Sequence, residues 1–467
     1  MRADQQGTVF GSEDVLDGEY PAGPVEPEPL DPAERTRFRT GLDVLAAVLI
    51  VIVALLVGLL IWQGSEIRAT THQTNPEPVP EPQLPTVFPP SLGEAWRAPS
   101  SATQVPVAAG PVVVTGDGGE VAGRDPLTGE VLWRYARDLP LCTIAPAFSL
   151  AIAVYRTDGG LLPAGDSRAG GGCSEAIAFD PATGLRGKQR KPDEPVDKPQ
   201  SGQRHTDAEV DTRLLYDGTY VTTTGRRLLT TWRSDLVQTM EYGTLPAIVN
   251  SGKQPRTDCT YGSVAVASGR IGVIERCGSD PGDRLTVYRA TNSDNKADEP
   301  AVVFSVVVGS SSARVVAMSA ATGQERTAVV LPDPSRLVVY DDQGKQVAEY
   351  PLGLPEQDLR GDPPGLVVPT TPGAAAVYWY TGSRTIALHS VELRPLWTVQ
   401  GTLGAGTIFA GRALFPVVDG IRVVDQATGE FVGTIPVDRA EYSGPVTMST
   451  IGPMVLEQRG ANLVALR

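Results

Sequence analysis

The sequence predicts an all-β protein: an eight-bladed β-propeller of four-stranded blades, with seven blades as the alternative, preceded by one transmembrane helix. Three observations support this fold. The phrase GRDPLTGEVLWR at residues 123–134 is echoed by FDPATG at 179–184 and by VDQATG at 424–429. Triplets of short alternating segments, separated by glycine turns, recur along the chain. One long, uncharged apolar run lies near the N-terminus.

The composition favours strands and turns and excludes nucleic-acid binding by electrostatics. The 467 residues include 50 Gly and 40 Pro, which are many for a helical protein and suit short strands joined by turns. Charged residues make up only 20% of the chain and the net charge is −14. There is therefore no basic surplus that could neutralise phosphates, and no nucleic-acid partner is expected.

The apolar run at residues 44–62 reads VLAAVLIVIVALLVGLLIW and carries no charge over nineteen residues. That length suffices to cross a bilayer, so residues 41–63 are predicted to form a transmembrane helix that binds the membrane through 44–62. A buried core helix fits such uniform hydropathy poorly. A cleaved signal peptide fits poorly as well, because the run is too long and no small-x-small cleavage site follows it.

The charges that flank this helix predict its orientation. Arg35, Arg37 and Arg39 precede it closely, whereas Arg68 is the only base close behind it. The positive-inside bias then places the N-terminus in the cytoplasm and the C-terminal domain outside, in a single-pass protein of the cell membrane. Residues 1–40 carry nine acids between Asp4 and Glu34 and little to bury, and are expected to be a disordered tail.

Residues 64–92 are predicted to be a proline-rich extracytoplasmic linker. Seven of the sixteen residues in NPEPVPEPQLPTVFPP, at 75–90, are Pro. Such a segment favours an extended, semi-rigid polyproline conformation. It is expected to act as a spacer that holds the following domain away from the membrane.

Residues 93–467 are predicted to form the propeller. Three alternating strands with Gly-containing hairpin turns are clearest at 104–129, 213–236, 407–429 and 446–467. Eight such triplets can be counted, at a period typical of propeller blades. Eight fourth strands are expected near Trp96, Trp133, Arg186, Val237, Val303, Val347, Trp397 and Phe431. Because the first fourth strand precedes any triplet and the last triplet has no fourth strand, both ends of the domain are expected to share one closing blade.

All four cysteines, Cys142, Cys173, Cys259 and Cys277, lie on the predicted outside, where disulfides persist. Three pairings are possible. Proximity in the sequence favours Cys142–Cys173 and Cys259–Cys277. A four-thiolate zinc site is the alternative, but no Cys-x-x-Cys spacing occurs.

The repeated phrase resembles the repeat of quinoprotein-like (PQQ-like) β-propellers, Ala-x-Asp-x-x-Thr-Gly-x-x-x-Trp. AFDPATG at 178–184 matches its first half and DPLTGEVLW at 125–133 its second half. The resemblance covers roughly 93–467, but only three blades carry it clearly. It implies that the turn and the Trp dock neighbouring blades. The residues so assigned are Asp125, Thr128, Gly129, Trp133, Asp180, Thr183, Gly184, Asp425, Thr428 and Gly429.

The enzymes of this family are dehydrogenases that bind pyrroloquinoline quinone and calcium, and the sequence does not favour that activity. Aromatic residues are only 6% of the chain, and the adjacent-cysteine disulfide of many such enzymes is absent. His72, His205 and His389 share no spacing and are expected at the surface. The acidic loops at 279–283 and 340–344 lack the alternating ligands of a calcium loop and are expected to be solvated turns. We therefore expect no catalytic residues, cofactor or metal.

The functional prediction is a membrane-anchored, extracytoplasmic scaffold or adaptor that binds proteins of the cell envelope during assembly or transport. It resembles the non-catalytic branch of the family, which includes a scaffold for outer-membrane protein assembly. A receptor for an envelope glycolipid or sugar is the alternative. Two insertions interrupt the repeat, at 157–172 and 187–210. Each is expected to be either a flexible solvated loop or a partner-binding loop.

Overall fold

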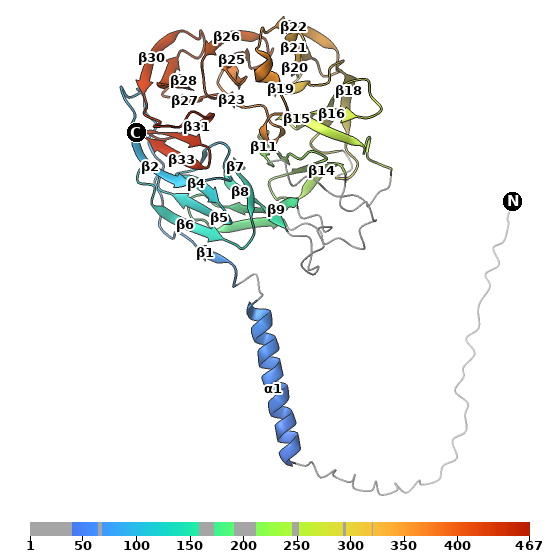
Figure 1. Ribbon diagram of the computed structural model, residues 1–467, viewed down its shortest axis with the longest axis vertical. Helices are drawn as coiled ribbons and strands as arrows, with labels where there is room; N and C mark the ends of the chain where they lie inside the picture. The colour runs from blue at the N-terminus through green and yellow to red at the C-terminus, as the bar shows by residue number, and fades with distance from the viewer. Residues whose placement is uncertain are drawn as a thin grey trace, which may run out of the picture. The chain divides into compact units, whose positions relative to one another are not determined.

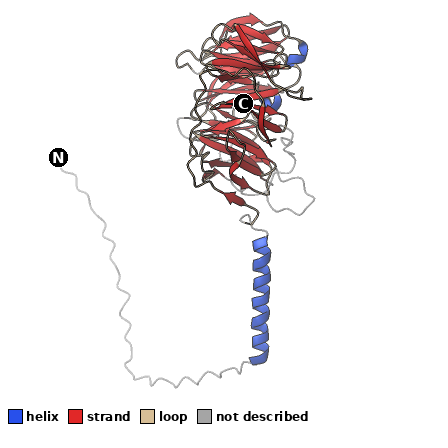
Figure 2. Ribbon diagram, turned by 90° about the vertical axis from the view of Figure 1, so that its left-hand side faces the viewer, coloured by secondary structure: helices blue, strands red, loops and turns tan. Residues whose placement is uncertain are grey.

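The computed structural model describes residues 40–63, 68–157, 172–190, 212–244, 252–292, 296–319 and 321–467, which belong to two compact units. The first unit contains helix α1 (Thr40–Gln63). Its segment Gly41–Trp62 is long and apolar enough to cross a membrane. The predicted disordered tail lies almost entirely outside the described residues. In the second unit, Glu66–Arg467, the described elements are strands and two short 3-10 helices (Figures 1 and 2).

The strands of the second unit form eight sheets around a common axis (Figure 1). We number these blades 1 to 8 by their innermost strands. The inner strands are β3 (Val107–Ala109), β7 (Leu141–Ala147), β11 (Leu214–Tyr216), β15 (Cys259–Ala267), β19 (Arg314–Met318), β23 (Thr370–Pro372), β27 (Thr407–Phe409) and β31 (Val446–Ile451). The second strands are β4 (Val112–Asp117), β8 (Leu150–Thr157), β12 (Val221–Thr223), β16 (Arg270–Cys277), β20 (Thr327–Pro332), β24 (Ala376–Tyr380), β28 (Arg412–Val417) and β32 (Met454–Arg459).

The third strands are β5 (Glu120–Arg124), β9 (Gly172–Phe179), β13 (Leu228–Trp232), β17 (Arg284–Arg289), β21 (Ser335–Tyr340), β25 (Arg384–His389), β29 (Gly420–Val424) and β33 (Asn462–Leu466). The outer strands are β6 (Val131–Ala136), β10 (Arg186–Arg190), β14 (Gln238–Gly243), β18 (Val302–Val307), β22 (Gln346–Pro351), β26 (Pro395–Gln400), β30 (Phe431–Pro436) and β2 (Glu94–Pro99). All eight predicted fourth strands are therefore confirmed, and the eight-bladed fold replaces the seven-bladed alternative.

Blade 8 closes the ring with strands from both ends of the domain. Its order is β2-β33-β32-β31, and β2 pairs with β33 from Glu94↔Leu466 to Pro99↔Asn462. The predicted closure by both termini is thus confirmed. It leaves the ring with no open end, so that edges remain only at its rim.

The strand order gives the ring two faces. Two kinds of connection lie on one face: the connection from the outer strand of each blade to the inner strand of the next blade, and the turn between the second and third strands of each blade. We call this the connection face. The inner-to-second and third-to-outer turns lie on the opposite face, which we call the turn face. Both 3-10 helices, η2 (Glu356–Leu359) and η3 (Pro364–Leu366), belong to an outer-to-inner connection and lie on one face of the disc (Figure 2).

The repeated Asp-x-x-Thr-Gly phrase forms the third-to-outer turns of blades 1, 2 and 7. In blade 2, Asp180 Oδ1 accepts hydrogen bonds from the Thr183 backbone N–H at 2.9 Å and from its hydroxyl at 2.8 Å. Asp125 and Thr128 make the same two contacts in blade 1, as do Asp425 and Thr428 in blade 7. A short polar side chain thereby fixes each turn in one conformation.

Each of these turns receives an aromatic side chain from the preceding blade. The Trp133 indole on β6 is fully buried, and its Nε1 donates to Pro181 O at 2.7 Å. Gly184 adopts φ +69°, and a Cβ there would lie 2.5 Å from the Trp133 ring. Gly129 faces Trp96 and Gly429 faces Trp397 in the same way. Glycine is needed at these positions for both its backbone conformation and the close approach of the indole.

Replacing Gly184 by Ala is expected to lower the free energy of unfolding by about 2–4 kcal/mol, because the new methyl group both strains the backbone and displaces a buried indole. Gly118 is the matched control: it has φ +57°, but no atom lies within 4 Å of its Cβ position. Gly118→Ala should therefore cost only about 1–2 kcal/mol of backbone strain. Thermal melting of the full chain in detergent measures both. Equal losses would show that the docked indole contributes nothing at this turn.

Two acidic loops that were expected to be solvated turns are instead partly built into the ring. In blade 5, a Cβ at Gly344 would lie 2.6 Å from the Phe304 ring, so this turn docks the preceding blade as the Thr-Gly turns do. Asp283 is 3% exposed and accepts a hydrogen bond from the Ala313 N–H at 2.8 Å. Burial raises the pKa of Asp283. For residues 340–344 the expectation failed because the docking side chain in blade 4 is Phe304, a residue outside the Trp-containing consensus.

The proline-rich linker makes contacts with the ring that were not predicted. Residues 71–73 form β1 (Thr71–Gln73), which pairs antiparallel with β6 as a fifth strand of blade 1. His72 Nε2 lies 2.9 Å from Gly184 O, and a Cβ at Gly452 in blade 8 would lie 2.4 Å from Pro82. The linker thus lies against blades 1, 2 and 8. Three residues without proline suffice to cover one exposed strand edge, which composition alone does not reveal.

Candidate interaction face

The connection face carries the longest segments between strands. Both predicted insertions start from it, because one joins β8 to β9 and the other joins β10 to β11. Most of residues 157–172 and 187–210 lies outside the described residues, so their roles stay predictions. The described part of the face contains two hollows and one long crossing connection, and these define the candidate site.

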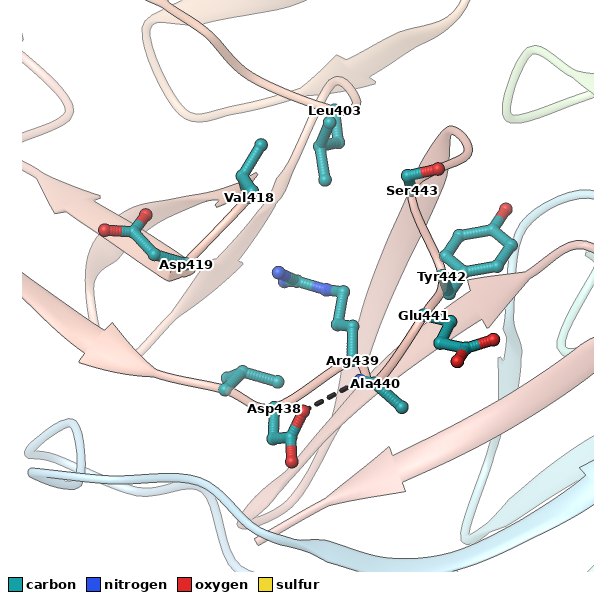
Figure 3. A pocket seen from close by; sticks show the side chains of 10 residues that line it. Leu403, Val418, Asp419, Asp438, Arg439, Ala440, Glu441, Tyr442 and Ser443 are labelled. Atoms are coloured by element: carbon teal, nitrogen blue, oxygen red, sulfur yellow. Dashed lines mark hydrogen bonds between the residues drawn. The ribbon is translucent and has the colours of Figure 1, made fainter.

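The larger hollow, of about 350 Å³, lies over blades 7 and 8 (Figure 3). It is lined by the connection from β30 to β31 and by the β28–β29 turn. Three carboxylates line it: Asp419, Asp438 and Glu441. Val418 is 79% exposed beside them, and the Tyr442 hydroxyl donates to Pro445 O at 2.6 Å. We call this the acidic hollow.

One arginine also lines this hollow, but its side chain is buried and held by other groups of the protein. The Arg439 guanidinium, whose side chain is 2% exposed, donates to Glu457 at 2.6 and 2.9 Å. Its remaining donors reach the carbonyls of Val417 and Gly420. Glu457 also accepts from Arg459 Nε at 2.7 Å. Because three carboxylates and only this one buried guanidinium line the hollow, the charge that it presents to a partner is negative.

The Arg439–Glu457 contact belongs to a pattern at three blade junctions. In each, an Arg of the outer-to-inner connection pairs with a buried Glu of the next blade. Arg256 donates to Glu275 Oε2 at 2.8 Å in blade 4, and Arg137 donates to Glu175 at 2.5 Å in blade 2. These pairs join neighbouring blades beneath the connection face. They were not predicted, although an Arg followed by a Glu 18 or 19 residues later occurs at two of the junctions.

A second distinctive feature is the connection between β22 and β23, residues 352–369, which we call the crossing loop. It leaves blade 5 and enters blade 6, yet it contacts blades 3 and 4 on the way. Gly365 O accepts a hydrogen bond from the Thr224 hydroxyl of blade 3 at 2.8 Å. Leu366 is 1% exposed and packs in the core shared by blades 3 and 4. The loop therefore passes over the inner ends of these blades.

Three arginines from three blades hold the crossing loop, and we call them the arginine cradle. Arg276 of blade 4 donates to Asp362 Oδ1 at 2.7 Å and to Oδ2 at 3.0 Å, and Arg226 of blade 3 donates to Oδ2 at 3.0 Å. Arg314 of blade 5 donates to the carbonyls of Asp358 and Gly361. Burial opposes ionisation of Asp362, but the hydrogen bonds from Arg276 and Arg226 outweigh it and lower its pKa.

A smaller hollow of about 240 Å³ adjoins the cradle. It is lined by Arg276, Ser311, Ser312, Gly361 and Asp362. Neither hollow was predicted. The smaller hollow and the cradle bring together residues that are distant in the sequence: Asp362 lies 136 positions from Arg226 and 86 from Arg276. Sequence offered one signal only, the length of the connection after β22.

The cysteines pair as proximity in the sequence favoured, Cys142 with Cys173 and Cys259 with Cys277. Among the residues that the structure describes, one group of potential metal ligands has its ligand atoms close together: Cys259, Glu275 and Cys277. Its two sulfurs are joined to each other, so they offer no thiolates. Of the histidines, His72 lies in β1, His389 Nδ1 accepts from the Glu392 N–H at 3.1 Å, and His205 lies outside the described residues.

No protein-family model matches the chain, and no curated protein sequence does. Solved structures of low sequence identity align with most of it. BamB from Moraxella catarrhalis is 12% identical, covering 80% of this chain and 99% of that chain at a TM-score of 0.44. Dihydro-heme d1 dehydrogenase NirN is 12% identical, and the alignment covers 84% of this chain and 80% of that chain at a TM-score of 0.46. Sqt1 of Saccharomyces cerevisiae is 10% identical, covering 81% and 99% at a TM-score of 0.48. The strand pairing of this chain itself establishes the eight-bladed ring.

Proposed function

We propose that this protein is a membrane-anchored, protein-binding scaffold of the cell envelope, related to the non-catalytic PQQ-like propellers, whose partners dock on the connection face. The observation that carries this proposal is the acidic hollow. It combines three carboxylates with the exposed side chain of Val418 on a ring whose strands fix the supporting loops. A basic side chain flanked by apolar residues is the complementary partner surface.

The anchoring that the proposal requires is supported by helix α1 and its flanking charges. Arg35, Arg37 and Arg39 precede the helix, which favours a cytoplasmic N-terminus and an extracytoplasmic propeller. An anchored scaffold searches for its partners in two dimensions only, which raises their effective concentration. The envelope location and this orientation are part of the proposal.

A receptor for a glycolipid or sugar on the axis of the ring is the second candidate function. The crossing loop is the observation against it, because this loop passes over the inner ends of three blades and is held there by the cradle. A ligand approaching the axis from the connection face would have to displace it. A quinoprotein dehydrogenase is the third candidate, and the repeat's resemblance alone favours it.

Site-specific photo-crosslinking in intact cells tests the scaffold proposal. A photo-reactive amino acid at Val418 or at Glu441 should capture the same envelope protein, because both positions border the acidic hollow. Val347 on outer strand β22, which is 42% exposed, is the matched control at the rim and should not capture that protein. Asp419→Lys with Asp438→Lys should reduce capture at Val418 by reversing the charge of the hollow. Equal capture at Val347, or none at Val418 and Glu441, would refute docking on this face.

A further inference from the structure

The arginine cradle brings three positive side chains to one short peptide segment. Arg226, Arg276 and Arg314 come from three consecutive blades, and together they contact Asp362 and two carbonyls of the same loop. A single Arg–carboxylate pair would suffice to pin a loop to the ring. Convergence of three guanidinium groups is instead typical of sites that recognise oxyanions.

The cradle has more donors than the crossing loop uses. Within the described residues, Arg276 Nε and Arg314 Nε are buried and make no hydrogen bond, although Arg276 Nε lies 3.5 Å from Asp283 Oδ1. The smaller hollow leaves room beside Arg276, and Ser311 and Ser312 also line it. Buried donors without acceptors are costly in a structural ion pair, because each keeps its desolvation penalty. A guanidinium that borders a hollow while holding a carboxylate suits a site that exchanges one acceptor for another.

The crossing loop occupies the cradle as a bound peptide would. It supplies a carboxylate at Asp362, carbonyls at Asp358 and Gly361, and an apolar anchor at Leu366. Gly361 and Gly365 have φ of +68° and +62°, so both sit in the left-handed conformation that glycine adopts without strain. The Asp362 side chain is 17% exposed, which leaves it accessible to a competitor from solvent.

We propose that the arginine cradle is a carboxylate-binding site for an acidic peptide segment of a partner protein, with Asp362 of the crossing loop as its built-in ligand. The partner's Asp or Glu replaces Asp362 on Arg226 and Arg276, and the loop between Gly361 and Gly365 moves away from the inner ends of the blades. The inference rests on the proposed function, since it names a second contact on the same connection face. In the resting protein, the tethered loop competes with the partner for the cradle, at an effective concentration on the order of millimolar.

Chemical rescue of Asp362→Ala in the full chain tests the site. We expect this variant to melt about 2–5 °C below the wild type, because it removes the carboxylate that Arg226 and Arg276 share. Sodium acetate at 100 mM should restore about half of the loss relative to sodium chloride of equal ionic strength, since it binds the folded state only. Asp235→Ala is the matched control: Asp235 pairs with Arg233 at 2.7 Å on the surface, and acetate should not stabilise that variant.

Two further variants keep this test decisive. Arg276→Gln added to Asp362→Ala should abolish the acetate effect, and Asp362→Asn replaces Asp362→Ala if the latter does not fold. Equal stabilisation of Asp362→Ala and Asp235→Ala by acetate would overturn the site. A rise in melting temperature with inorganic phosphate and none with acetate would overturn the assignment to a carboxylate.

A fluorescent peptide copying residues 356–368, EQDLRGDPPGLVV, tests the peptide class of the ligand. A control peptide has Asn at the position of Asp362. The first peptide should bind the Asp362→Ala protein at least about tenfold more tightly than the control peptide, because one good charged pair contributes about tenfold in affinity. Equal binding of the two peptides, or binding of neither, would overturn the proposal. If photo-crosslinking at Val418 succeeds while both peptides fail, the scaffold function stands without this site.

Discussion

Deleting residues 447–467 is expected to prevent the second unit from folding, leaving aggregated protein in place of a smaller stable domain. The deletion removes nearly all of β31 and all of β32 and β33, which are three of the four strands of blade 8. Nine of the apolar side chains that the deletion removes are at most 6% exposed: Met448, Ile451, Met454, Val455, Leu456, Leu463, Val464, Ala465 and Leu466. Their burial contributes on the order of 15–25 kcal/mol, which exceeds the 5–15 kcal/mol by which domains are usually stable.

Loss of the closing blade also exposes edges that the ring otherwise hides. Strand β2 loses its partner β33, and the packing of blade 8 against blades 7 and 1 is lost. Exposed edges of this kind pair with other chains. Size-exclusion chromatography and thermal melting in detergent measure the outcome. A monodisperse truncated protein with a cooperative melting transition would contradict closure by blade 8.

A deletion of similar length elsewhere is the control. Replacing residues 191–210 by a short Gly-Ser segment removes twenty residues of a strongly polar insertion, outside the described part of the chain. Since so polar a segment offers little apolar surface to bury, the ring should keep its melting temperature within a few degrees. The same variant also tests whether the insertion takes part in docking. If it does, photo-crosslinking at Val418 should capture less of the partner protein.

The blade count and the closure could be predicted because both rest on local signals. Glycine turns mark each triplet of strands, and the unmatched strand at Trp96 and the unmatched triplet ending at Arg467 must complete each other. The docking turns were predictable for the same reason, since Asp180, Thr183 and Gly184 act within one turn. Such contacts join residues that are close in the sequence, so a short motif is enough to predict them.

The arginine cradle could not be predicted in this way because its contacts join residues of several blades. Asp362 meets Arg226 and Arg276 only after blades 3 to 5 are assembled, and the sequence around it, RGDPPG, indicates no more than a turn-rich loop. The pairing of the linker was not predicted for a related reason: its prolines predict extension, but an extended segment next to an unpaired edge can still join it. Strand β1 uses residues 71–73, which precede the proline-rich stretch.

Substituting Glu457 by Gln is expected to lower the free energy of unfolding by about 3–5 kcal/mol, a large share of the stability of a domain. Glu457 is fully buried and accepts from both Arg439 and Arg459, whose side chains are 2% and 6% exposed. Without its negative charge, two guanidinium groups remain buried with no counter-ion. Water cannot replace the lost carboxylate at so enclosed a position, so the charges cannot be screened as they are at the surface.

An exposed Arg–Glu ion pair provides the control for this prediction. Glu392 accepts from Arg394 at 2.7 Å, but the two side chains are 59% and 46% exposed. Glu392→Gln should therefore change the free energy of unfolding by less than about 1 kcal/mol. Denaturant unfolding of the full chain in detergent compares the two variants, and equal losses would contradict a role for burial.

A third variant separates the destabilisation caused by unpaired buried charge from the destabilisation caused by losing the contacts of Glu457. Replacing Arg439 and Arg459 by Met together with Glu457 by Leu removes all three charges at once. Apolar replacement of a complete buried ion-pair network is often neutral in stability, whereas removal of one partner is not. The triple variant should thus recover most of the stability that Glu457→Gln loses.

The triple variant should still capture less of the partner protein at Val418. The reason is that Arg439, which it lacks, also holds the carbonyls of Val417 and Gly420 to blade 8. Recovered stability together with reduced capture would assign this arginine to shaping the acidic hollow, whereas unchanged capture would assign it to packing between blades 7 and 8 alone.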